Sequence, residues 1–144
     1  MDIDAIKQIL PHRPPMLLVE QVELAGDGSA AGRYTVKGDE FFLQGHFPGN
    51  PVVPGVILCE MIAQTSCILL ANNAKDSGET SATPMFTSLD KVKFRRPVKP
   101  GDMVETHCRI TRSKGPFYFC EGGASVDGQQ AVSCQFSFAL VKGE

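Results

Sequence analysis

A histidine, the expected start of a helix and a carboxylate lie close together in the stretch from His46 to Glu60. A histidine can take a proton near neutral pH, and a carboxyl group in apolar surroundings can hold a proton and return it. Free N–H groups where the helix begins, at Gly55 and Val56, can stabilise a negative oxygen. A base, an acid and an oxyanion site suit proton abstraction beside a carbonyl, followed by loss of a leaving group.

The segment that carries the histidine, "HFPGNPVVP" from His46 to Pro54, is predicted to be stiff. Each of its three prolines has a fixed φ angle and no N–H group. The residue before each proline is restricted to extended geometry. We therefore expect this segment, called the strap below, to hold the His46 ring in a fixed place and to lead into a helix at Pro54 and Gly55.

Glu60 lies inside the apolar run "GVILCEMIAQ", about a turn and a half into that helix. Gln64 is four residues later on the same helix face, where its amide can bond to the carboxylate. A carboxylate in apolar surroundings is costly unless it is paired or its pKa rises, and a raised pKa suits a general acid. The alternative is that Glu60 reaches solvent at the helix edge and that His46 is an ordinary loop residue. Local reasoning leaves both interpretations open.

The other titratable residues give weaker signals. His107 falls on the polar face of a predicted strand and is expected at the surface. His12, in "LPHRPP", has no neighbour in the sequence that equips it for chemistry. The chain has no nucleophile elbow, no dinucleotide or phosphate loop, and no His/Cys/Asp cluster at metal-ligand spacing, so no metal is expected.

Length and composition predict a single domain over residues 1–144 in the cytoplasm. The acidic N-terminus does not resemble a secretory signal. The five cysteines form no C-x-x-C pair and are expected to be reduced core residues. The apolar run 55–72 could span a bilayer by length, but it contains Glu60, Gln64 and two hydroxyl side chains. We predict a buried helix instead.

The pattern of the remaining chain predicts an α+β fold. A short amphipathic helix is expected at 2–10, a long helix at about 55–72, and a surface loop at 72–84. Strands are expected at 16–24, 29–37, 85–98, 103–111, 117–126 and 130–141, mostly joined as hairpins. In the last strand Val132, Cys134, Phe136, Phe138 and Leu140 share the core face, opposite Ser133, Gln135 and Ser137. The long helix is apolar almost all round, so we expect an antiparallel sheet of about six strands to wrap it and a second copy to cover the remainder.

Three stretches of the chain resemble the FabZ-type 3-hydroxyacyl-[acyl-carrier-protein] dehydratases. These are "GHFPGNPVVPGVILCEMIAQ", "LPHRPPMLLVEQV" and "SLDKVKFRRPVKPGD", which together extend the resemblance over nearly the whole chain. The resemblance implies a hot-dog fold, a sheet wrapped around a long central helix. It also implies dimers with joined sheets, commonly assembled into hexamers, and an active site where the histidine of one subunit meets the glutamate of the other.

The chemistry implied by the resemblance is reversible removal of water from a (3R)-3-hydroxyacyl thioester, giving the trans-2-enoyl thioester without a cofactor. His46 would take the α proton, and Glu60, held by Gln64, would protonate the departing hydroxyl. The Gly55 N–H would polarise the thioester carbonyl. FabA-type enzymes, which also isomerise the double bond, carry aspartate at the position of Glu60, so glutamate favours the FabZ type.

The same resemblance suggests a function for the basic residues in the second half of the chain. Residues 91–114 hold eight basic side chains against two acidic ones. On their own they read as solvated strand faces or as a docking patch for an acidic partner. Since acyl carrier protein is acidic, Arg95, Arg96 and Lys99 become candidate docking residues. The chain departs from the family at Pro14, at Ser88 and at "GDE" (38–40), away from the catalytic pair but where the acyl tunnel could change.

Two other functions fit the same fold class. A hot-dog thioesterase uses a helix carboxylate for hydrolysis and does not need the histidine of the strap. A non-catalytic acyl-binding module would need neither His46 nor Glu60. The presence of both residues favours the dehydratase.

Overall fold

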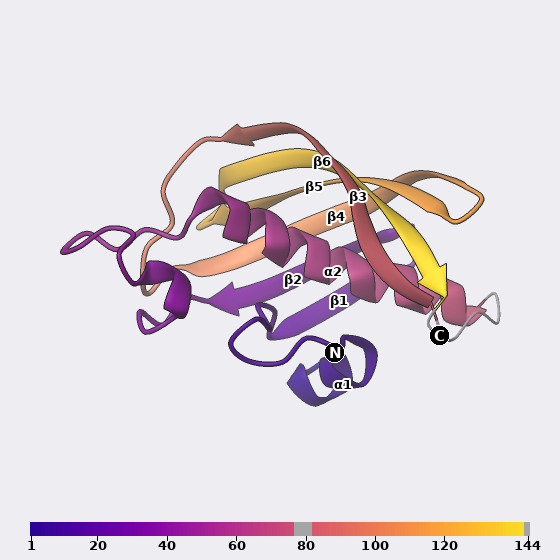
Figure 1. Ribbon diagram of the computed structural model, residues 1–144, viewed down its shortest axis with the longest axis horizontal. Helices are drawn as coiled ribbons and strands as arrows, with labels where there is room; N and C mark the ends of the chain where they lie inside the picture. The colour runs from indigo at the N-terminus through magenta and orange to yellow at the C-terminus, as the bar shows by residue number, and fades with distance from the viewer. Residues whose placement is uncertain (77–81, 143–144) are drawn as a thin grey trace.

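The computed structural model describes residues 1–76 and 82–142, with side chains described for 1–73 and 84–141. Its elements are α1 (Ile3–Ile9), β1 (Gln21–Ala25), β2 (Ser29–Thr35), the short 3₁₀ helix η1 (Phe41–Leu43) and α2 (Gly55–Asp76), followed by β3 (Ala82–Phe94), β4 (Met103–Lys114), β5 (Phe117–Val126) and β6 (Gln129–Lys142). Figure 1 shows the strands curving around α2, with the strap projecting from the end where α2 begins.

The six strands form one antiparallel sheet in the order β1-β2-β4-β5-β6-β3. The β5–β6 hairpin turns at Asp127 and Gly128, whose φ angles of 51° and 76° are both positive, as a two-residue type I′ turn requires. This confirms the strongest hairpin signal of the sequence. β3, 13 residues long, pairs with β6 on one side and forms an edge of the sheet.

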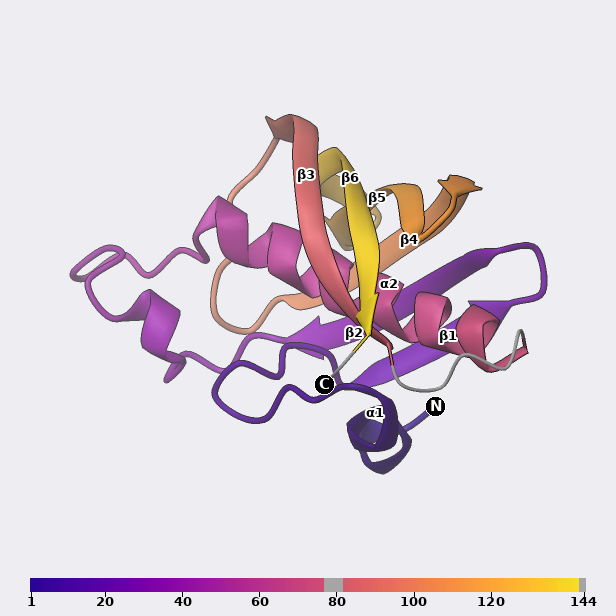
Figure 2. The same cartoon turned by 45° about the vertical axis from the view of Figure 1, so that its right-hand side comes forward.

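Helix α2 packs across the inner face of this sheet. Met61, Ile62 and Ile68 have no exposed surface. The stretch Gly55–Asn73 is long and apolar enough to cross a membrane, but 67% of its most apolar window is buried within the structure. Its apolar character is therefore that of a core helix, as predicted. Figure 2 shows α1 at the bottom of the molecule, beneath β1.

Several predicted boundaries are wrong: the third strand spans 82–94 instead of 85–98, the second ends at Thr35 instead of residue 37 and the fourth ends at Lys114 instead of residue 111. The first strand begins at Gln21 and not at Met16, because the Leu18 N–H and the Met16 carbonyl bond to the side chain of Gln64 instead of to a neighbouring strand. Helix α2 continues to Asp76 although a loop was expected from residue 72. The centre of that predicted loop, 77–81, lies outside the described residues.

Ser137 was expected on the solvent side of the last strand but is 4% exposed. Its hydroxyl bonds to those of Thr87 and Ser88 on β3, each at 2.6 Å. The pairing of β3 with β6 is irregular between Phe86 and Ser88, and this bulge brings two consecutive hydroxyls over Ser137. The buried hydroxyl is thus satisfied within the sheet.

Candidate active site

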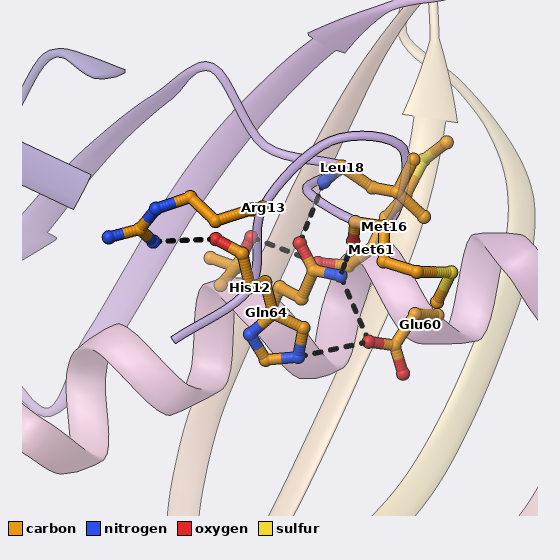
Figure 3. A network of polar contacts seen from close by, with 8 residues as sticks. His12, Arg13, Met16, Leu18, Glu60, Met61 and Gln64 are labelled. Atoms are coloured by element: carbon orange, nitrogen blue, oxygen red, sulfur yellow. Dashed lines mark hydrogen bonds and ion pairs between the residues drawn. The ribbon is translucent and has the colours of Figure 1, made fainter. Parts of the chain in front are cut away.

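Gln64 connects the middle of α2 to the chain segment before β1. The residue is fully buried, and its Oε1 accepts the Leu18 N–H at 2.8 Å. Its Nε2 donates to the Met16 carbonyl at 2.7 Å and to Glu60 Oε2 at 2.9 Å (Figure 3). Both N–H bonds and the oxygen of the amide are used, which fixes its orientation. The predicted contact between Gln64 and Glu60 is present.

The Glu60 carboxyl is only partly buried, with 25% of its side chain exposed. Oε2 receives the Gln64 amide and also faces His12 Nε2, 3.7 Å away. Among the described residues no hydrogen bond reaches Oε1. One carboxyl oxygen is therefore engaged by the protein and the other is available to a substrate.

His12 is the residue at this site that sequence reasoning missed. It had no partner nearby in the chain, yet the structure places its ring beside Glu60 (Figure 3). Its Nδ1 is buried and has no hydrogen-bond partner in the part of the chain that the structure describes. No local pattern marks such a contact, since the two residues come from different elements far apart in the sequence.

The strap holds His46 through three bonds. The His46 N–H donates to the Leu43 carbonyl at 3.1 Å, and the His46 carbonyl accepts the Val52 N–H at 2.9 Å. The ring Nδ1 lies 2.8 Å from the Val52 carbonyl oxygen. A carbonyl can only accept, so Nδ1 carries the proton and the neutral ring presents a lone pair at Nε2.

The tip of the strap adds to this rigidity. Phe47 and Asn50 exchange backbone hydrogen bonds of 3.0 and 2.9 Å, which close a tight turn. The Phe47 ring stacks on the His46 ring with centroids 4.1 Å apart. The strap is thus an ordered support, as its prolines predict.

Helix α2 begins with free backbone donors at Gly55 and Val56. The Pro54 carbonyl accepts hydrogen bonds from the N–H groups of Ile57 and Leu58. Within the described chain the N–H groups of Gly55 and Val56 have no acceptor. The Phe94 ring at the end of β3 lies so close to Gly55 that a methyl group there would overlap it. A side chain at residue 55 would therefore have to displace the Phe94 ring, and Phe94 is a second neighbour of the site that the sequence did not reveal.

Among the described residues of a single chain, no hydrogen bond or ion pair joins His46 to Glu60. The surface near them is unusually apolar for an exposed region. Phe47, Val56 and Phe94 are 53%, 67% and 58% exposed, on the strap, at the start of α2 and at the end of β3. The two predicted catalytic side chains are thus placed and oriented separately, beside apolar surface.

The three candidate docking residues differ in availability. Arg95 and Lys99 are exposed, whereas Arg96 donates to Gln129 Oε1 at 2.6 Å beside the β5–β6 turn. Arg95 also lines a cavity of about 760 Å³ over the sheet, together with Lys93 and other charged residues. None of His46, Glu60 and Gln64 lines this cavity, so it is separate from the site described above.

Four of the five cysteines have a raised thiol pKa, whereas a hydrogen bond with the Cys134 thiol lowers the pKa of Cys59. All five are free and buried, as predicted. Burial raises the pKa of the Cys67 and Cys120 thiols to about 12, so neither forms a thiolate near neutral pH. Among the residues that the structure describes, no three His, Cys, Asp or Glu side chains are grouped to hold a metal ion.

Comparison with known proteins shows the family of the chain. Residues 10–135 match the FabA-like domain family. The chain is 40% identical over 140 residues to a 3-hydroxyacyl-[acyl-carrier-protein] dehydratase FabZ of Staphylococcus haemolyticus, covering 96% of this chain and 94% of the relative. A FabZ of Staphylococcus aureus strain JH9 matches with the same identity and coverage.

Solved structures with lower identity show the fold. The dehydratase heterocomplex ApeI:P of Xenorhabdus doucetiae superposes with a TM-score of 0.80 at 24% identity, covering 94% of this chain and 90% of that one. A thioesterase variant of Pseudomonas aeruginosa superposes with a TM-score of 0.73 at 13% identity, covering 99% and 96%. The predicted hot-dog fold is confirmed. Near-complete coverage at 40% identity shows the family as well: the chain belongs to the FabA-like family and, within it, to the FabZ-type 3-hydroxyacyl-[acyl-carrier-protein] dehydratases.

Proposed function

We propose that His46 and Glu60 carry out the dehydration of a (3R)-3-hydroxyacyl chain on acyl carrier protein, in a site that two copies of this chain share. His46 Nε2 takes the proton from the α carbon, and the electron pair moves toward the thioester carbonyl. The Gly55 N–H at the start of α2 stabilises the oxygen that becomes negative. The C3–O bond then breaks, Glu60 donates a proton to the leaving hydroxyl, and water and the trans-2-enoyl thioester are released.

The observation that carries this proposal is that the two side chains are held in complementary ways, His46 with a basic nitrogen exposed and Glu60 with one carboxyl oxygen free. The bond from His46 Nδ1 to the Val52 carbonyl leaves Nε2 as the basic nitrogen. Glu60 is held through Oε2 and keeps Oε1 free. After one turnover His46 carries a proton and Glu60 has lost one, so a proton transfer through water restores the starting state.

We infer that a second copy completes the site, since no hydrogen bond or ion pair joins His46 to Glu60 among the described residues of one chain. The β3 edge of the sheet has backbone groups free for pairing, and Met85, Phe86 and Leu89 on it are 54%, 44% and 42% exposed. Pairing of two such edges would join two sheets and bury this apolar surface. The expected hexamer, built from such dimers, the single-domain organisation and the cytoplasmic location belong to the same proposal.

Acyl carrier protein would dock on the basic residues near the site. Arg95 and Lys99 are the better candidates, since the Arg96 guanidinium is already bonded to Gln129. Substituting Arg95 and Lys99 by glutamate is expected to raise KM for a carrier-bound substrate and to leave KM for a small thioester unchanged. An equal rise for both substrates would contradict docking.

The activity is tested by adding purified protein to crotonyl thioester and following the loss of enoyl absorbance as water adds. His46→Ala and Glu60→Gln should each abolish the reaction while the variants remain folded and assembled. Full activity in either variant would contradict the mechanism. Release of free thiol without hydration would indicate a thioesterase instead.

A further inference from the structure

His12 occupies an unexplained position next to the proposed acid. Its Nε2 lies 3.7 Å from Glu60 Oε2, and its ring is 28% exposed. This separation is too long for a formed hydrogen bond. Catalytic hydrogen bonds are often long in a protein without substrate and shorten in the complex, so the contact is within reach of a small ring movement.

The other ring nitrogen determines which atom of His12 carries the proton. Nδ1 is buried and has no partner among the described residues. A proton on Nδ1 would leave a buried N–H without an acceptor and would turn the lone pair of Nε2 toward Glu60 Oε2, so that two acceptors faced each other. The neutral ring therefore carries its proton on Nε2, and that N–H is directed at Glu60.

The backbone on both sides of His12 is fixed. The Arg13 guanidinium donates to the carbonyls of Lys7, Leu10 and His12 at 3.0, 2.9 and 2.7 Å, which ties this segment to the end of α1 (Figure 3 shows the bond to the His12 carbonyl). A few residues later the backbone of Met16 and Leu18 clamps Gln64. Residues 10–18 are called the N-terminal clamp below. The clamp acts on Glu60 Oε2 directly through His12, and indirectly through Gln64, which its backbone holds.

We propose that His12 is a positioning residue for Glu60, which donates from Nε2 to Oε2 and, together with Gln64, turns Oε1 toward the substrate. This rests on the proposed role of Glu60 as the acid. His12 does not touch the substrate itself. Its contribution is to restrict the carboxyl group to one orientation, which affects the rate of the chemical step and not substrate binding.

The test compares three His12 variants in the full-length, assembled enzyme. In His12→Gln the side-chain N–H donor is close to the place of Nε2, and in His12→Asn it is close to the place of Nδ1. His12→Phe keeps the ring and has no donor. We expect His12→Phe and His12→Asn to lower kcat for crotonyl thioester hydration about tenfold to a hundredfold with KM unchanged, and His12→Gln to recover most of kcat.

Stability separates positioning from a merely structural role. Because His12→Phe replaces an unpaired buried nitrogen with carbon, its Tm should equal or exceed that of the wild type. The matched controls are His107→Gln and His107→Phe, at an exposed histidine on β4, which should leave kcat unchanged. A His12→Phe enzyme with wild-type kcat, or a kcat loss that His12→Gln fails to recover, would overturn the proposal.

The double variant with Glu60→Gln distinguishes this inference from the proposed function. If Glu60 is the acid, Glu60→Gln is inactive alone and His12→Phe lowers its residual rate no further, since the two residues act as a unit. An active Glu60→Gln enzyme would contradict the proposed function itself. An inactive Glu60→Gln enzyme beside a fully active His12→Phe enzyme would overturn only the role of His12.

Discussion

The strap and the N-terminal clamp each hold a histidine, but they leave opposite ring nitrogens protonated. In the strap, His46 Nδ1 is bonded to the Val52 carbonyl, so Nε2 presents a lone pair. In the clamp, His12 Nδ1 has no partner among the described residues, so Nε2 presents an N–H. Two identical side chains are thus prepared by their surroundings, one to accept a proton and the other to donate a hydrogen bond.

The two regions also achieve rigidity by different means. The strap is stiff mainly because of its prolines and its short-range backbone bonds, and one long-range bond from the Val53 N–H to the Val98 carbonyl anchors its end. The clamp is held by contacts with other elements, since its Arg13 donates to the Lys7 carbonyl of α1 and its Leu18 N–H donates to the buried Gln64 of α2. This contrast implies that a substitution in the strap acts on the base and a substitution in the clamp acts on the acid.

Loss of the strap histidine should have the largest effect. His46→Gln removes the basic nitrogen but leaves a polar side chain in the strap. Because a general base contributes about 10² to 10⁴ in rate, kcat should fall by at least about a hundredfold with Tm nearly unchanged. Steady-state kinetics and a thermal melt check this. If a His46→Gln enzyme kept more than a tenth of the wild-type rate, the strap would not hold the base.

Loss of the clamp glutamine should reduce both activity and stability. Gln64→Ala removes the partner of the buried Leu18 N–H and of the partly buried Met16 carbonyl and Glu60 carboxyl group. Unfolding free energy should fall by about 2–4 kcal/mol, and kcat by about tenfold or more. Denaturant unfolding and kinetics measure the two effects.

Gln64→Glu is the matched control for that variant. It keeps an acceptor for the Leu18 N–H but cannot donate to Glu60 unless it is protonated. It should therefore be at least as inactive as Gln64→Ala at neutral pH. Wild-type activity in Gln64→Glu would contradict the idea that an amide donor orients Glu60.

Crowding the start of α2 should have an intermediate effect. Gly55→Ala keeps the backbone N–H but forces the Phe94 ring to move. We expect kcat/KM to fall about tenfold, since a displacement near the reacting atoms is costly. The double variant Gly55→Ala/Phe94→Ala should recover activity relative to Gly55→Ala if the ring is the cause. Absence of any recovery would place the effect in the N–H group or the helix start instead.

The smallest effect is expected at Glu40, which precedes η1 and the strap. Burial acts to raise the pKa of its carboxyl group, but hydrogen bonds from the Lys37 N–H, the Tyr34 hydroxyl and the Gly38 N–H outweigh burial and lower that pKa. A lowered pKa in the folded state contributes stability above the ordinary carboxyl pKa, and this is lost as pH falls through the folded value. Glu40→Gln should cost about 1 kcal/mol near neutral pH and nothing in strong acid.

Unfolding of the wild type and Glu40→Gln across acidic pH measures this difference. Catalytic activity should change little, since the bonds from Leu43 and Val52 that hold His46 remain. A large loss of kcat would show that the strap depends on Glu40 and is not self-supporting.

The sequence predicted what depends on local patterns. The alternation in β4, the Asp127–Gly128 turn and the stiffness of the strap depend on a few neighbouring residues, and the structure confirms each of them, whereas Ser137 departs from the alternation predicted for β6. The contact of Gln64 with Glu60 was also predictable, because helix spacing places them on one face.

The rest depends on contacts between distant segments. Gln64 bonds to the carbonyl of Met16, 48 residues earlier. Because of this contact β1 begins only at Gln21, and the segment before it places His12 beside Glu60. Phe94 reaches Gly55 only because β3 ends beside the start of α2. Ser137 is buried because of a bulge in a neighbouring strand. Sequence periodicity carries no information about any of these.

Complementation between two inactive variants tests the shared site most directly. His46→Ala and Glu60→Gln are co-expressed with different affinity tags, and the mixed assembly is purified by both tags in turn. In a mixed dimer one site has both wild-type residues and the other has neither, so activity should return to about half that of the wild-type dimer. A doubly tagged, folded dimer without activity would contradict the claim that His46 of one copy works with Glu60 of the other.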